Sequence, residues 1–341
     1  MEKIPKVVII GAGNIGSEVY KRVKELEWIV SAVVDVDGVF KELPKNEKIG
    51  NVEDYPKYLL GTDLAFLTIS TFDDGKIAYS YIKNCLEAGV PVVTCEKGAL
   101  SNYYSELEEG VKKGFIGFNA TVGGGTRVLR YARERVGNNT KCVHAILNGT
   151  LNFIFESLSD GYGLNEIVEK AQKLGYAEPG ASNPLEIINK EAMSDVKMKA
   201  VILFNACNLG NEKIRAKDVA VRPINSFELE TLVEQAKNRR YIVSIGSAPL
   251  QEDIIGGFNH KAGKWFIDAG FRCLDENLIY KDLVSREAGN AFHIYESYDC
   301  CNGESNSGNY LLKGPGAGAG PTAHSMILDA KEILELKFEN S

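Results

Sequence analysis

The sequence is poor in the residues that bind structural zinc. It has seven cysteines, an odd number, and four histidines, with no Cys-x-x-Cys pair and no histidine at zinc-site spacing. The cysteines are scattered at Cys85, Cys95, Cys142, Cys207, Cys273, Cys300 and Cys301. We expect them to be reduced and buried. The adjacent Cys300 and Cys301 leave two interpretations open, a redox-active pair and an inert vicinal pair.

Clusters of basic residues and long apolar runs are also absent. The net charge is -7 and no block of Lys and Arg occurs, which argues against a nucleic-acid partner, because phosphate binding needs clustered cations. No apolar run approaches the roughly 18–20 residues of a membrane span, and the run near the N-terminus is too short for a signal peptide. We therefore expect a cytoplasmic enzyme that binds a small molecule and contacts neither membrane nor nucleic acid.

The strongest local pattern is a glycine-rich turn near the N-terminus. The β-branched run Val7–Ile10 predicts a strand, and residues 17–26 carry apolar and charged residues at helical spacing. The turn between them contains Gly11, Ala12, Gly13, Asn14, Ile15 and Gly16. In a dinucleotide-binding turn, the first glycine permits the turn, the second lets the pyrophosphate approach the backbone, and the third lets the helix pack on the strand. A structural glycine turn without a ligand is the alternative.

An acidic residue follows at the distance that this turn requires. The apolar run Trp28–Val34 ends in Asp35, roughly 20 residues past the last glycine. The Asp35 carboxylate would accept hydrogen bonds from both adenosine ribose hydroxyls and would repel a 2′-phosphate. Asp37 adds a second negative charge and no arginine lies alongside. We therefore expect NAD to be preferred over NADP.

Two further apolar runs, Leu64–Ile69 and Val90–Thr94, are separated by a helical pattern. This alternation predicts a Rossmann-type, doubly wound parallel sheet with crossover helices, an α/β fold. Ligands bind at the carboxyl ends of such strands, so we assign Ser70, Thr71 and Lys97 to the cofactor site. Lys97 would polarise a carbonyl or transfer a proton. The alternative is a solvated lysine that opens a helix.

The remaining chain predicts a second domain and a returning C-terminal segment. Glycines and other small residues in Phe118–Leu129 cannot form a regular helix interior, because each glycine costs ~1 kcal/mol relative to alanine. We expect a dinucleotide-binding domain over residues 1–122, a substrate-binding and dimerisation domain over 123–310, and a glycine-rich loop and helix over 311–341. The second domain should be α+β with mixed strands and with helices over 148–158, 164–174 and 192–208, and the final helix should cover 324–335.

The middle of the chain contains a polar constellation suited to a small zwitterion. Gly175 and Tyr176 precede Ala177 and Glu178, just past a helical pattern. Asp195 and Lys199 are four residues apart and share one face of a helix. The alternatives are a helix end capped by Gly175 with a surface glutamate, and an ordinary surface ion pair.

Five motifs together resemble the homoserine dehydrogenase family, and the resemblance covers most of the chain. They are TCEK at 94–97, ATVGGGT at 120–126, NGTLNF at 148–153, GYAE at 175–178 with DVKMK at 195–199, and GPGAGAGPTA at 314–323. The resemblance implies reversible reduction of aspartate 4-semialdehyde to homoserine with NAD(P)H. It also implies a homodimer formed through the second domain.

The same resemblance implies roles for individual residues. Tyr176, Glu178 and Asp195 would hold the amino and hydroxyl groups of the substrate, and Lys199 and Lys97 would serve the proton transfer. Residues near the substrate carboxylate would be Asn148, Gly149 and Thr150, and Gly316 and Gly318 would lie against the nicotinamide ribose. A sodium or similar ion would be bound by main-chain carbonyls of Val122, Gly124 and Thr126 and by the side chain of Asn119. Because Asn119 replaces an acid of the family, we expect this ion to be bound more weakly.

The chain departs from the family pattern in three places. The segment between Glu178 and Asp195 is longer than usual, and we expect it to form a loop in which Asn183, Glu186 or Asn189 makes new substrate contacts. Met193 replaces a glycine, and Glu96 replaces an asparagine. No ACT-type regulatory extension is expected. A relative acting on a different semialdehyde or hydroxy acid, and a non-catalytic dinucleotide sensor, remain the alternative functions.

Overall fold

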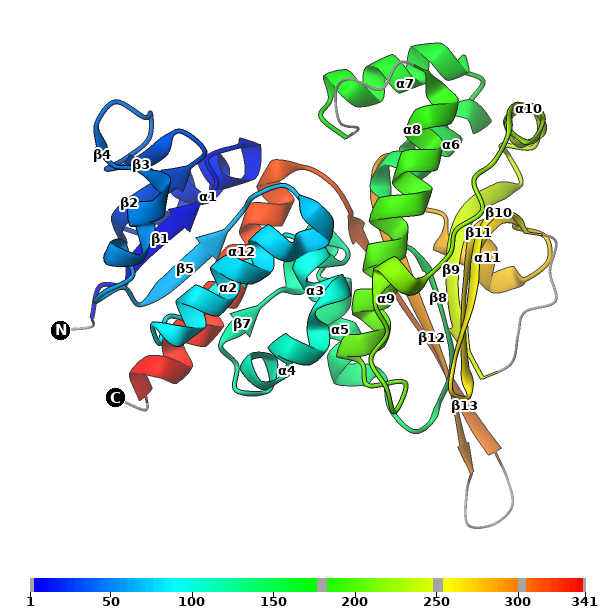
Figure 1. The fold of residues 1–341 in the computed structure, drawn as a ribbon. Coiled ribbons are helices and arrows are strands. Elements are labelled where there is room, and N and C mark those ends of the chain that lie inside the picture. The colour runs from blue at the N-terminus through cyan, green and yellow to red at the C-terminus, as the bar shows by residue number, and fades with distance from the viewer. Residues whose placement is uncertain (1–2, 177–182, 248–253, 300–304, 340–341) are drawn as a thin grey trace. The chain divides into compact units, whose positions relative to one another are not determined.

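A computed structural model describes residues 3–176, 183–247, 254–299 and 305–339 (Figure 1). The chain forms two compact units, Met1–Gly125 with Ala319–Ser341, and Thr126–Gly318. Residues 311–315 were expected in the returning C-terminal segment. They instead complete strand β13 of the second unit, because they continue its pairing with β12.

The first unit is built on a sheet of order β4-β3-β2-β1-β5-β6-β7. Its parallel strands are β2 (Ile29–Asp35), β1 (Lys6–Ile10), β5 (Leu64–Leu67), β6 (Val92–Thr94) and β7 (Ile116–Gly117). The predicted Rossmann-type parallel sheet is therefore confirmed. Two short antiparallel strands that the sequence did not indicate, β3 (Gly38–Phe40) and β4 (Lys48–Gly50), extend it beyond β2.

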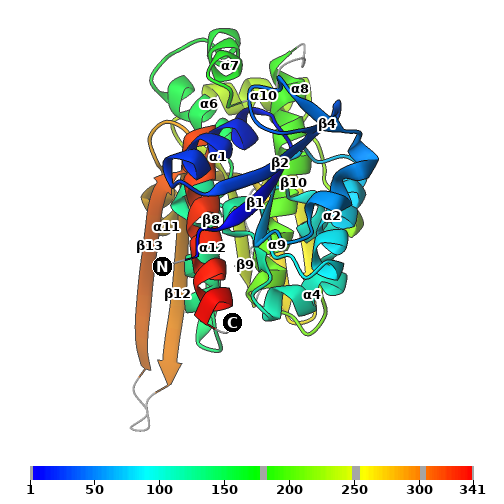
Figure 2. The same ribbon diagram turned by 90° about the vertical axis from the view of Figure 1, so that its left-hand side faces the viewer.

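Helices cover both faces of this sheet, as Figure 2 shows. They are α1 (Asn14–Glu25) and α12 (Ala319–Glu339) on one face, and α2 (Lys76–Glu87) and α4 (Tyr104–Lys112) on the other. The short helix α3 (Gly98–Asn102) packs against α2 and α4. Short 3₁₀ turns occupy Val52–Tyr58, Asp73–Gly75, Asn119–Thr121 and Gly124–Thr126.

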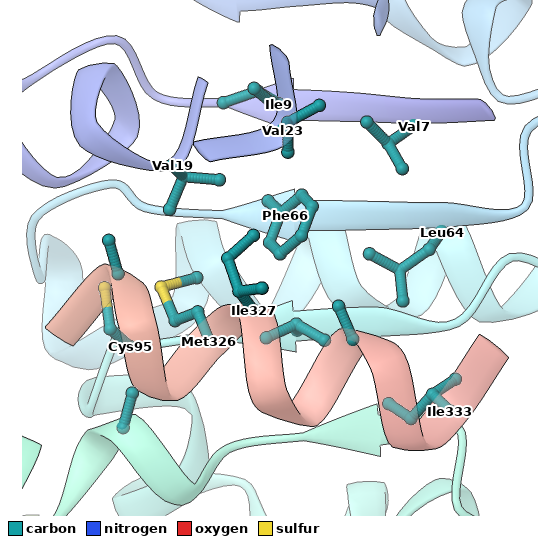
Figure 3. Close-up of a cluster of buried hydrophobic side chains, with 14 of the residues drawn as sticks. Val7, Ile9, Val19, Val23, Leu64, Phe66, Cys95, Met326, Ile327 and Ile333 are labelled. Carbon is teal, nitrogen blue, oxygen red and sulfur yellow. The ribbon is translucent and has the colours of Figure 1, made fainter. Parts of the chain in front are cut away.

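The C-terminal helix α12 belongs to the core of the first unit. Its Met326 and Ile327 pack with Phe66 of β5 and Ile9 of β1 in one buried apolar cluster (Figure 3). The helix starts at Ala319, five residues before the predicted start at 324, because a proline is tolerated in a first helical turn. Part of the glycine-rich segment is therefore helical.

The second unit contains a sheet of order β10-β11-β9-β8-β12-β13. Its strands are β8 (Thr140–Ile146), β9 (Arg239–Gly246), β10 (Ile255–Ala262), β11 (Trp265–Cys273), β12 (Gly289–Asp299) and β13 (Ser305–Pro315). All five neighbouring pairs of these strands are antiparallel, so the expected mixture of strand directions is wrong. The α+β class is confirmed.

Helices of the second unit include one long composite helix. The shorter ones are α5 (Val128–Arg135), α6 (Gly149–Ser159), α7 (Leu164–Lys173), α10 (Ser226–Glu234) and α11 (Leu278–Leu283), with a 3₁₀ turn at Ala216–Asp218. The composite helix runs through α8 (Pro184–Lys190), the π-helical turn η5 (Glu191–Val196) and α9 (Lys197–Ala206). The expected loop is therefore helical from Pro184, because Asn183 accepts a hydrogen bond from the Glu186 amide and Pro184 occupies the first helical position.

The five described cysteines form no disulfide. Cys85 and Cys95 are buried, and burial raises the pKa of these thiols to about 12 and about 11. Cys142, Cys207 and Cys273 are partly exposed, which corrects the expectation that all would be buried, and the pair 300–301 lies outside the described residues. In the described part of the chain, no helix combines the length and apolarity that crossing a membrane requires.

Strand β8 carries a buried histidine between the sheet and α11. His144 is 2% exposed, lies 2.8 Å from the Ser244 hydroxyl through Nδ1, and stacks on His293. Burial, with smaller contributions from the charges of His293 and Arg272, lowers the pKa of His144 from 6.5 to about 3. Below about pH 6.5 the unfolded chain therefore binds a proton that the folded chain refuses, and acid favours unfolding.

We predict that His144→Asn reduces the loss of stability on acidification. Between about pH 7 and pH 5, one such histidine contributes on the order of 1–2 kcal/mol of unfolding free energy, lost as the pH falls. Denaturant unfolding at both pH values measures the difference, with His260→Asn on β10 as the control at a partly exposed site. An equal pH dependence in the wild type and in His144→Asn would contradict the prediction.

Candidate functional site

The glycine-rich turn of the first unit is closely packed at two of its glycines. Gly11 has a φ of 103°, and a Cβ there would lie 2.9 Å from the Thr68 carbonyl carbon. A Cβ on Gly16 would lie 1.9 Å from the Gly11 oxygen. Thr68, which the sequence analysis did not single out, donates its hydroxyl to that same Gly11 oxygen at 2.8 Å. Contacts among Gly11 after β1, Thr68 after β5 and Gly16 in the first turn of α1 therefore fix the conformation of the turn.

Gly13 differs from these two glycines because it faces open space. A Cβ added there would meet no atom within 4 Å. Gly13 is the N-cap of α1, whose first turn contains Asn14 and Ile15, and no side chain caps this fully described helix start. Its first amides are therefore available to an anion, as at the pyrophosphate site of dinucleotide-binding helices.

The predicted ribose-binding acid has a partner that the sequence did not reveal. The Lys45 ammonium lies 2.8 Å from Oδ2 of Asp35 and 2.8 Å from Oδ2 of Asp37. Hydrogen bonds to Asp35 and Asp37 raise the pKa of Lys45, and the bond from Lys45 lowers the pKa of Asp37. A cation therefore stands beside the acid at the end of β2. It comes from the connection between β3 and β4, two strands that were not expected.

One of the predicted cofactor residues, Thr71 after β5, contacts a buried glutamate after β6. Glu96 is 2% exposed and accepts hydrogen bonds from the Thr71 hydroxyl and from the Gly98 and Ala99 amides. A carboxylate that accepts the first amides of α3 is stabilised by that helix start, which explains why a glutamate suits this position. Lys97 is the partly buried N-cap of α3, and Ser70 is exposed.

In the second unit, Gly175 and Tyr176 close helix α7. Gly175 has a φ of 70°, its amide donates to Gln172, and the Tyr176 amide donates to Ala171, which together form a Schellman cap. The capping alternative is therefore observed. The cap also fixes Tyr176, whose carbonyl accepts the Thr150 hydroxyl at 2.6 Å. The predicted substrate residue at position 178 lies outside the described residues.

The acid and lysine four residues apart form a largely buried pair. The Lys199 ammonium lies 2.7 Å from Oδ2 of Asp195 and donates to the Leu147 carbonyl at 2.8 Å. Lys199 is only 8% exposed, so the alternative of an ordinary surface ion pair is wrong. Asp195 stays partly exposed, with 20% of its side chain accessible. A buried lysine held by a carboxylate and a carbonyl has a fixed position, which general acid and base catalysis requires.

Asn148 joins this pair to a second acid. Its Nδ2 donates to Glu191 Oε2 at 2.6 Å and to Asp195 Oδ2 at 2.8 Å, and its Oδ1 accepts the Leu151 amide at 2.7 Å. Glu191 was missed from the sequence because position 191 was assigned to a loop. Its spacing of four residues before Asp195 was the available signal.

Two glycines near Asn148 and Lys199 allow close contacts between segments of the second unit. A Cβ on Gly149 would lie 2.6 Å from the Ala288 oxygen, and a Cβ on Gly316 would lie 2.2 Å from the Asn290 side chain. Asn290 Nδ2 donates to the Leu147 carbonyl, which also accepts from Lys199. Gly318, with a φ of 108°, ends the second unit.

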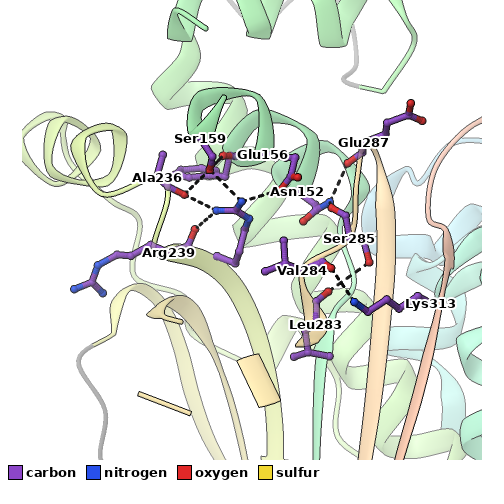
Figure 4. A network of polar contacts seen from close by, with 12 residues as sticks. Asn152, Glu156, Ser159, Ala236, Arg239, Leu283, Val284, Ser285, Glu287 and Lys313 are labelled. Carbon is purple, nitrogen blue, oxygen red and sulfur yellow. Dashed lines mark hydrogen bonds and ion pairs between the residues drawn. The ribbon is translucent and has the colours of Figure 1, made fainter. Parts of the chain in front are cut away.

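A cavity of about 530 Å³ is lined by Tyr176, by residues 284–289 and by the end of β13 with Ala317. Asn152, a member of the predicted NGTLNF motif, holds this loop by donating to the carbonyls of Ser285 and Glu287 at 2.7 and 2.9 Å (Figure 4). Glu156 of the same helix pairs with Arg240 of β9 at 2.8 Å, which ties α6 to the sheet. The loop beside the cavity is therefore positioned by α6.

Two of the three residues expected to make new substrate contacts have structural hydrogen bonds. Asn183 caps α8, and Asn189 exchanges two hydrogen bonds of 2.9 Å with the backbone of Ile224. Glu186 and Met193 are exposed. The lengthened segment thus contributes Glu191 to the constellation around Asn148 and Asp195, and the substrate contacts expected of Asn183, Glu186 or Asn189 stay a prediction.

The predicted cation ligands include one residue with a clear structural partner. Asn119 donates its main-chain amide and its Nδ2 to the Asp329 carboxylate of α12, at 2.9 and 2.8 Å. An acid in its place would repel Asp329, which explains the asparagine. The buried Oδ1 of Asn119 accepts no hydrogen bond in the described structure and is a suitable cation ligand.

The main-chain ligands of the predicted cation site lie in the segment that follows. Val122 and Gly124 are buried, and Thr126 donates its hydroxyl to the Pro315 carbonyl. Among the described residues, no three His, Cys, Asp or Glu side chains are grouped to bind a metal. A site here would therefore depend on carbonyl oxygens.

The sheet, the glycine turn and the uncapped start of α1 define the first unit as a dinucleotide-binding α/β fold. The family model described as homoserine dehydrogenase matches residues 128–330, which is more than half of the chain. The chain belongs to the homoserine dehydrogenase family.

Two relatives are similar to this chain in sequence, and two solved structures share its fold. The NAD(+)-dependent homoserine dehydrogenase of Pseudomonas canavaninivorans is 32% identical over 197 residues, which cover 57% of this chain and about half, 54%, of that enzyme. Homoserine dehydrogenase of Pyrococcus horikoshii is 25% identical over 98% of both chains. A crystal structure of a putative homoserine dehydrogenase from Archaeoglobus fulgidus has a TM-score of 0.69 at 21% identity, covering 97% of this chain and 99% of that one. A hyperthermophilic archaeal homoserine dehydrogenase in complex with NADPH has a TM-score of 0.67 at 22% identity, covering 98% of both chains.

Proposed function

We propose that this protein is a homoserine dehydrogenase that interconverts L-homoserine and L-aspartate 4-semialdehyde with NAD(P). The observation that carries the proposal is the buried Lys199, which is held by Asp195 and the Leu147 carbonyl beside Asn148. Membership of the family supports the same conclusion. The reaction belongs to the synthesis of threonine and methionine.

In the proposed reaction, the cofactor would transfer the hydride and side chains of the protein would transfer the proton. A nicotinamide cofactor, held at the glycine turn of the first unit, would supply the hydride acceptor for oxidation of the alcohol and the hydride donor for reduction of the aldehyde. In the direction of oxidation, Lys199 removes the proton from the substrate hydroxyl, and in reduction it donates a proton to the carbonyl oxygen. Asp195 keeps Lys199 in position through their 2.7 Å contact. Lys97 lies in the other unit, and its assistance to the proton transfer stays a prediction.

The cofactor is proposed to bind at the turn of Gly11, Gly13 and Gly16. Open space at Gly13 and the uncapped start of α1 suit a pyrophosphate, and the carboxylate of Asp35 suits ribose hydroxyls. At the substrate end, Tyr176, Asp195 and the turn Asn148–Thr150 are proposed to hold the amino acid. These assignments rest on the geometry of each unit taken separately.

Oxidation of L-homoserine followed by NADH absorbance tests the proposed function. We expect turnover with homoserine to exceed turnover with a panel of other hydroxy amino acids and hydroxy acids. Turnover of another member of the panel, with none of homoserine, would favour an enzyme for a different semialdehyde. Dinucleotide binding without any turnover would favour a sensor.

We predict that NAD is preferred over NADP and that Lys45 and Asp35 set the ratio. Asp35→Asn should lower the NAD to NADP ratio of kcat/KM by about 10-fold, because one repulsive charge facing a 2′-phosphate is removed. Lys45→Met should raise the ratio, because it removes the cation that lies 2.8 Å from both Asp35 and Asp37. Steady-state kinetics with both cofactors gives the two ratios.

The control for this prediction is Lys41→Met. Lys41 pairs with Glu47 at 3.1 Å in the same connection and does not contact Asp35. It should leave the ratio unchanged. A wild-type preference for NADP of about 10-fold or more, or an unchanged ratio in Asp35→Asn, would contradict the prediction.

Three further expectations from the sequence stay predictions. They are the homodimer, the cytoplasmic location and the monovalent cation. The cation would be held by the Asn119 Oδ1 and by main-chain carbonyls of Val122, Gly124 and Thr126. Size-exclusion chromatography with light scattering measures the first of the three directly.

A further inference from the structure

We propose that Arg286 is a substrate-binding residue of this enzyme, which holds the carboxylate of the amino acid from the wall of the cavity beside Tyr176. This inference rests on the proposed function. The residues assigned so far leave that carboxylate without a cation, because the Lys199 ammonium lies 2.7 Å from Asp195 and is assigned to the proton transfer. A charged group that leaves water needs a partner of opposite charge.

The cavity adjoins the first turn of α6. One of its lining residues, Tyr176, accepts the Thr150 hydroxyl through its carbonyl at 2.6 Å. A Cβ on Gly149 would lie 2.6 Å from the oxygen of Ala288 and 3.1 Å from the Cβ of Ala317, which both line the cavity. Lining residues from three separate segments therefore lie against the turn that is proposed to hold the amino acid. The volume of about 530 Å³ is typical of small-molecule sites.

Positive charge prevails on the wall of this cavity. Its charged lining residues are Arg286, Glu287 and Lys313. The Lys313 ammonium donates to the Val284 carbonyl at 2.9 Å, and the Glu287 side chain extends away from Lys313 and pairs with neither cation (Figure 4). In the parts of the chain that the structure describes, the Arg286 guanidinium has no hydrogen-bond or ion-pair partner. Its five N–H donors are therefore available to a ligand.

The loop that carries Arg286 has a fixed conformation. Asn152 donates to the carbonyls on either side of Arg286, those of Ser285 and Glu287, at 2.7 and 2.9 Å (Figure 4). The Gly289 amide donates to the Arg286 carbonyl at 3.2 Å. Glu287 has a φ of 55°, a left-handed conformation that non-glycine residues keep where the surrounding structure holds them, and such residues cluster at ligand sites. A fixed loop also lowers the entropic cost of holding a ligand.

The charges on the two sides of the first turn of α6 identify the group that Arg286 would bind. A guanidinium binds a carboxylate through two parallel hydrogen bonds, each strengthened by charge. Asp195 would repel a carboxylate, so the substrate would place its carboxylate at Arg286 and its hydroxyl at Lys199. A phosphate of the cofactor is the other anion with matching chemistry, and the experiment separates the two.

The test compares homoserine with 3-aminopropan-1-ol, which is homoserine without its carboxylate. Arg286→Gln removes the charge and keeps a polar side chain. We expect KM for homoserine to rise by about 10- to 100-fold, with a smaller change in kcat, because charged hydrogen bonds to the substrate are lost. The inhibition constant of 3-aminopropan-1-ol against homoserine should stay within about 2-fold, because this ligand has no carboxylate. Arg286→Lys restores a cation and should recover part of the affinity for homoserine.

The matched control is Arg222→Gln, because Arg222 does not line this cavity and pairs with Glu228 at 2.7 Å. It removes the same charge and should leave both constants unchanged. If Arg286→Gln weakens homoserine and 3-aminopropan-1-ol equally, Arg286 only shapes the site, which overturns the proposal. An unchanged KM for homoserine overturns it as well. A raised Kd of NAD with that unchanged KM would assign Arg286 to a phosphate of the cofactor instead.

Failure of the proposed function gives a different result. If the wild type oxidises another amino acid or hydroxy acid in place of homoserine, the same comparison is made with that substrate and its analogue without the carboxylate. If nothing is oxidised, calorimetric titration measures homoserine binding to the wild type and to Arg286→Gln, and equal binding or none overturns the proposal. Circular dichroism checks that Arg286→Gln is folded. If it is not, Arg286→Ala is compared in the same way, with the same outcomes supporting or overturning the proposal.

Discussion

Replacement of Lys199 by methionine is expected to lower kcat for homoserine oxidation by about 100-fold or more, while the affinity for NAD stays nearly unchanged. Methionine fills the space of the lysine stem but cannot accept or donate the proton. The Kd of NAD is measured by protein fluorescence and the turnover by NADH absorbance. A rate loss confined to kcat identifies a group that acts in the chemical step.

Lys197→Met is the control for this substitution. Lys197 lies two residues earlier in the same helix, so it faces another direction and is partly exposed. Its variant should retain the wild-type rate. If Lys199→Met also retained the rate, the proton would be transferred by another group and the assignment would be wrong.

Gly16→Ala is expected to abolish tight NAD binding and to lower the free energy of unfolding by about 1–3 kcal/mol. The added methyl group would lie 1.9 Å from the Gly11 oxygen and 2.7 Å from the Thr68 hydroxyl, so the turn or the start of α1 must shift. Denaturant unfolding without cofactor measures the stability, and a fluorescence titration measures the binding.

Gly13→Ala separates the two effects. Gly13 has an ordinary φ of -71° and open space at its Cβ, so we expect unchanged stability but weaker binding, because the methyl group enters the space proposed for the pyrophosphate. Equal stability losses in both variants would contradict the assigned packing. Unchanged NAD affinity in Gly13→Ala would contradict the proposed site of the pyrophosphate.

The sequence predicted those features that depend on local spacing. The G-x-G-x-x-G turn, the strand before it and the acid at Asp35 follow one another within one βαβ unit, and each has a fixed physical reason. Lys45 could not be predicted in the same way. It reaches Asp35 only because the short strands β3 and β4 turn the chain back beside β2.

The proposed substrate site around Asp195 and Lys199 could also be predicted only in part from the sequence. The spacing of Asp195 and Lys199 predicted that they share a helix face, but spacing cannot say whether that face is buried. Their burial comes from α9, in which every residue from Met198 to Ala206 is buried. Glu191 was missed for another reason: it lies one residue before the predicted start of the helix at 192, in the segment that was assigned to a loop.

The return of α12 to the first unit has a consequence for synthesis of the chain. The apolar faces of β1 and β5 are covered by residues from beyond position 318, together with α1. The second unit is continuous in sequence, so it can complete its core while the first still lacks its last helix. We therefore expect the N-terminal unit to finish folding last, the reverse of the usual order on the ribosome. Asp329 can then accept its two hydrogen bonds from Asn119 only after α12 has been synthesised.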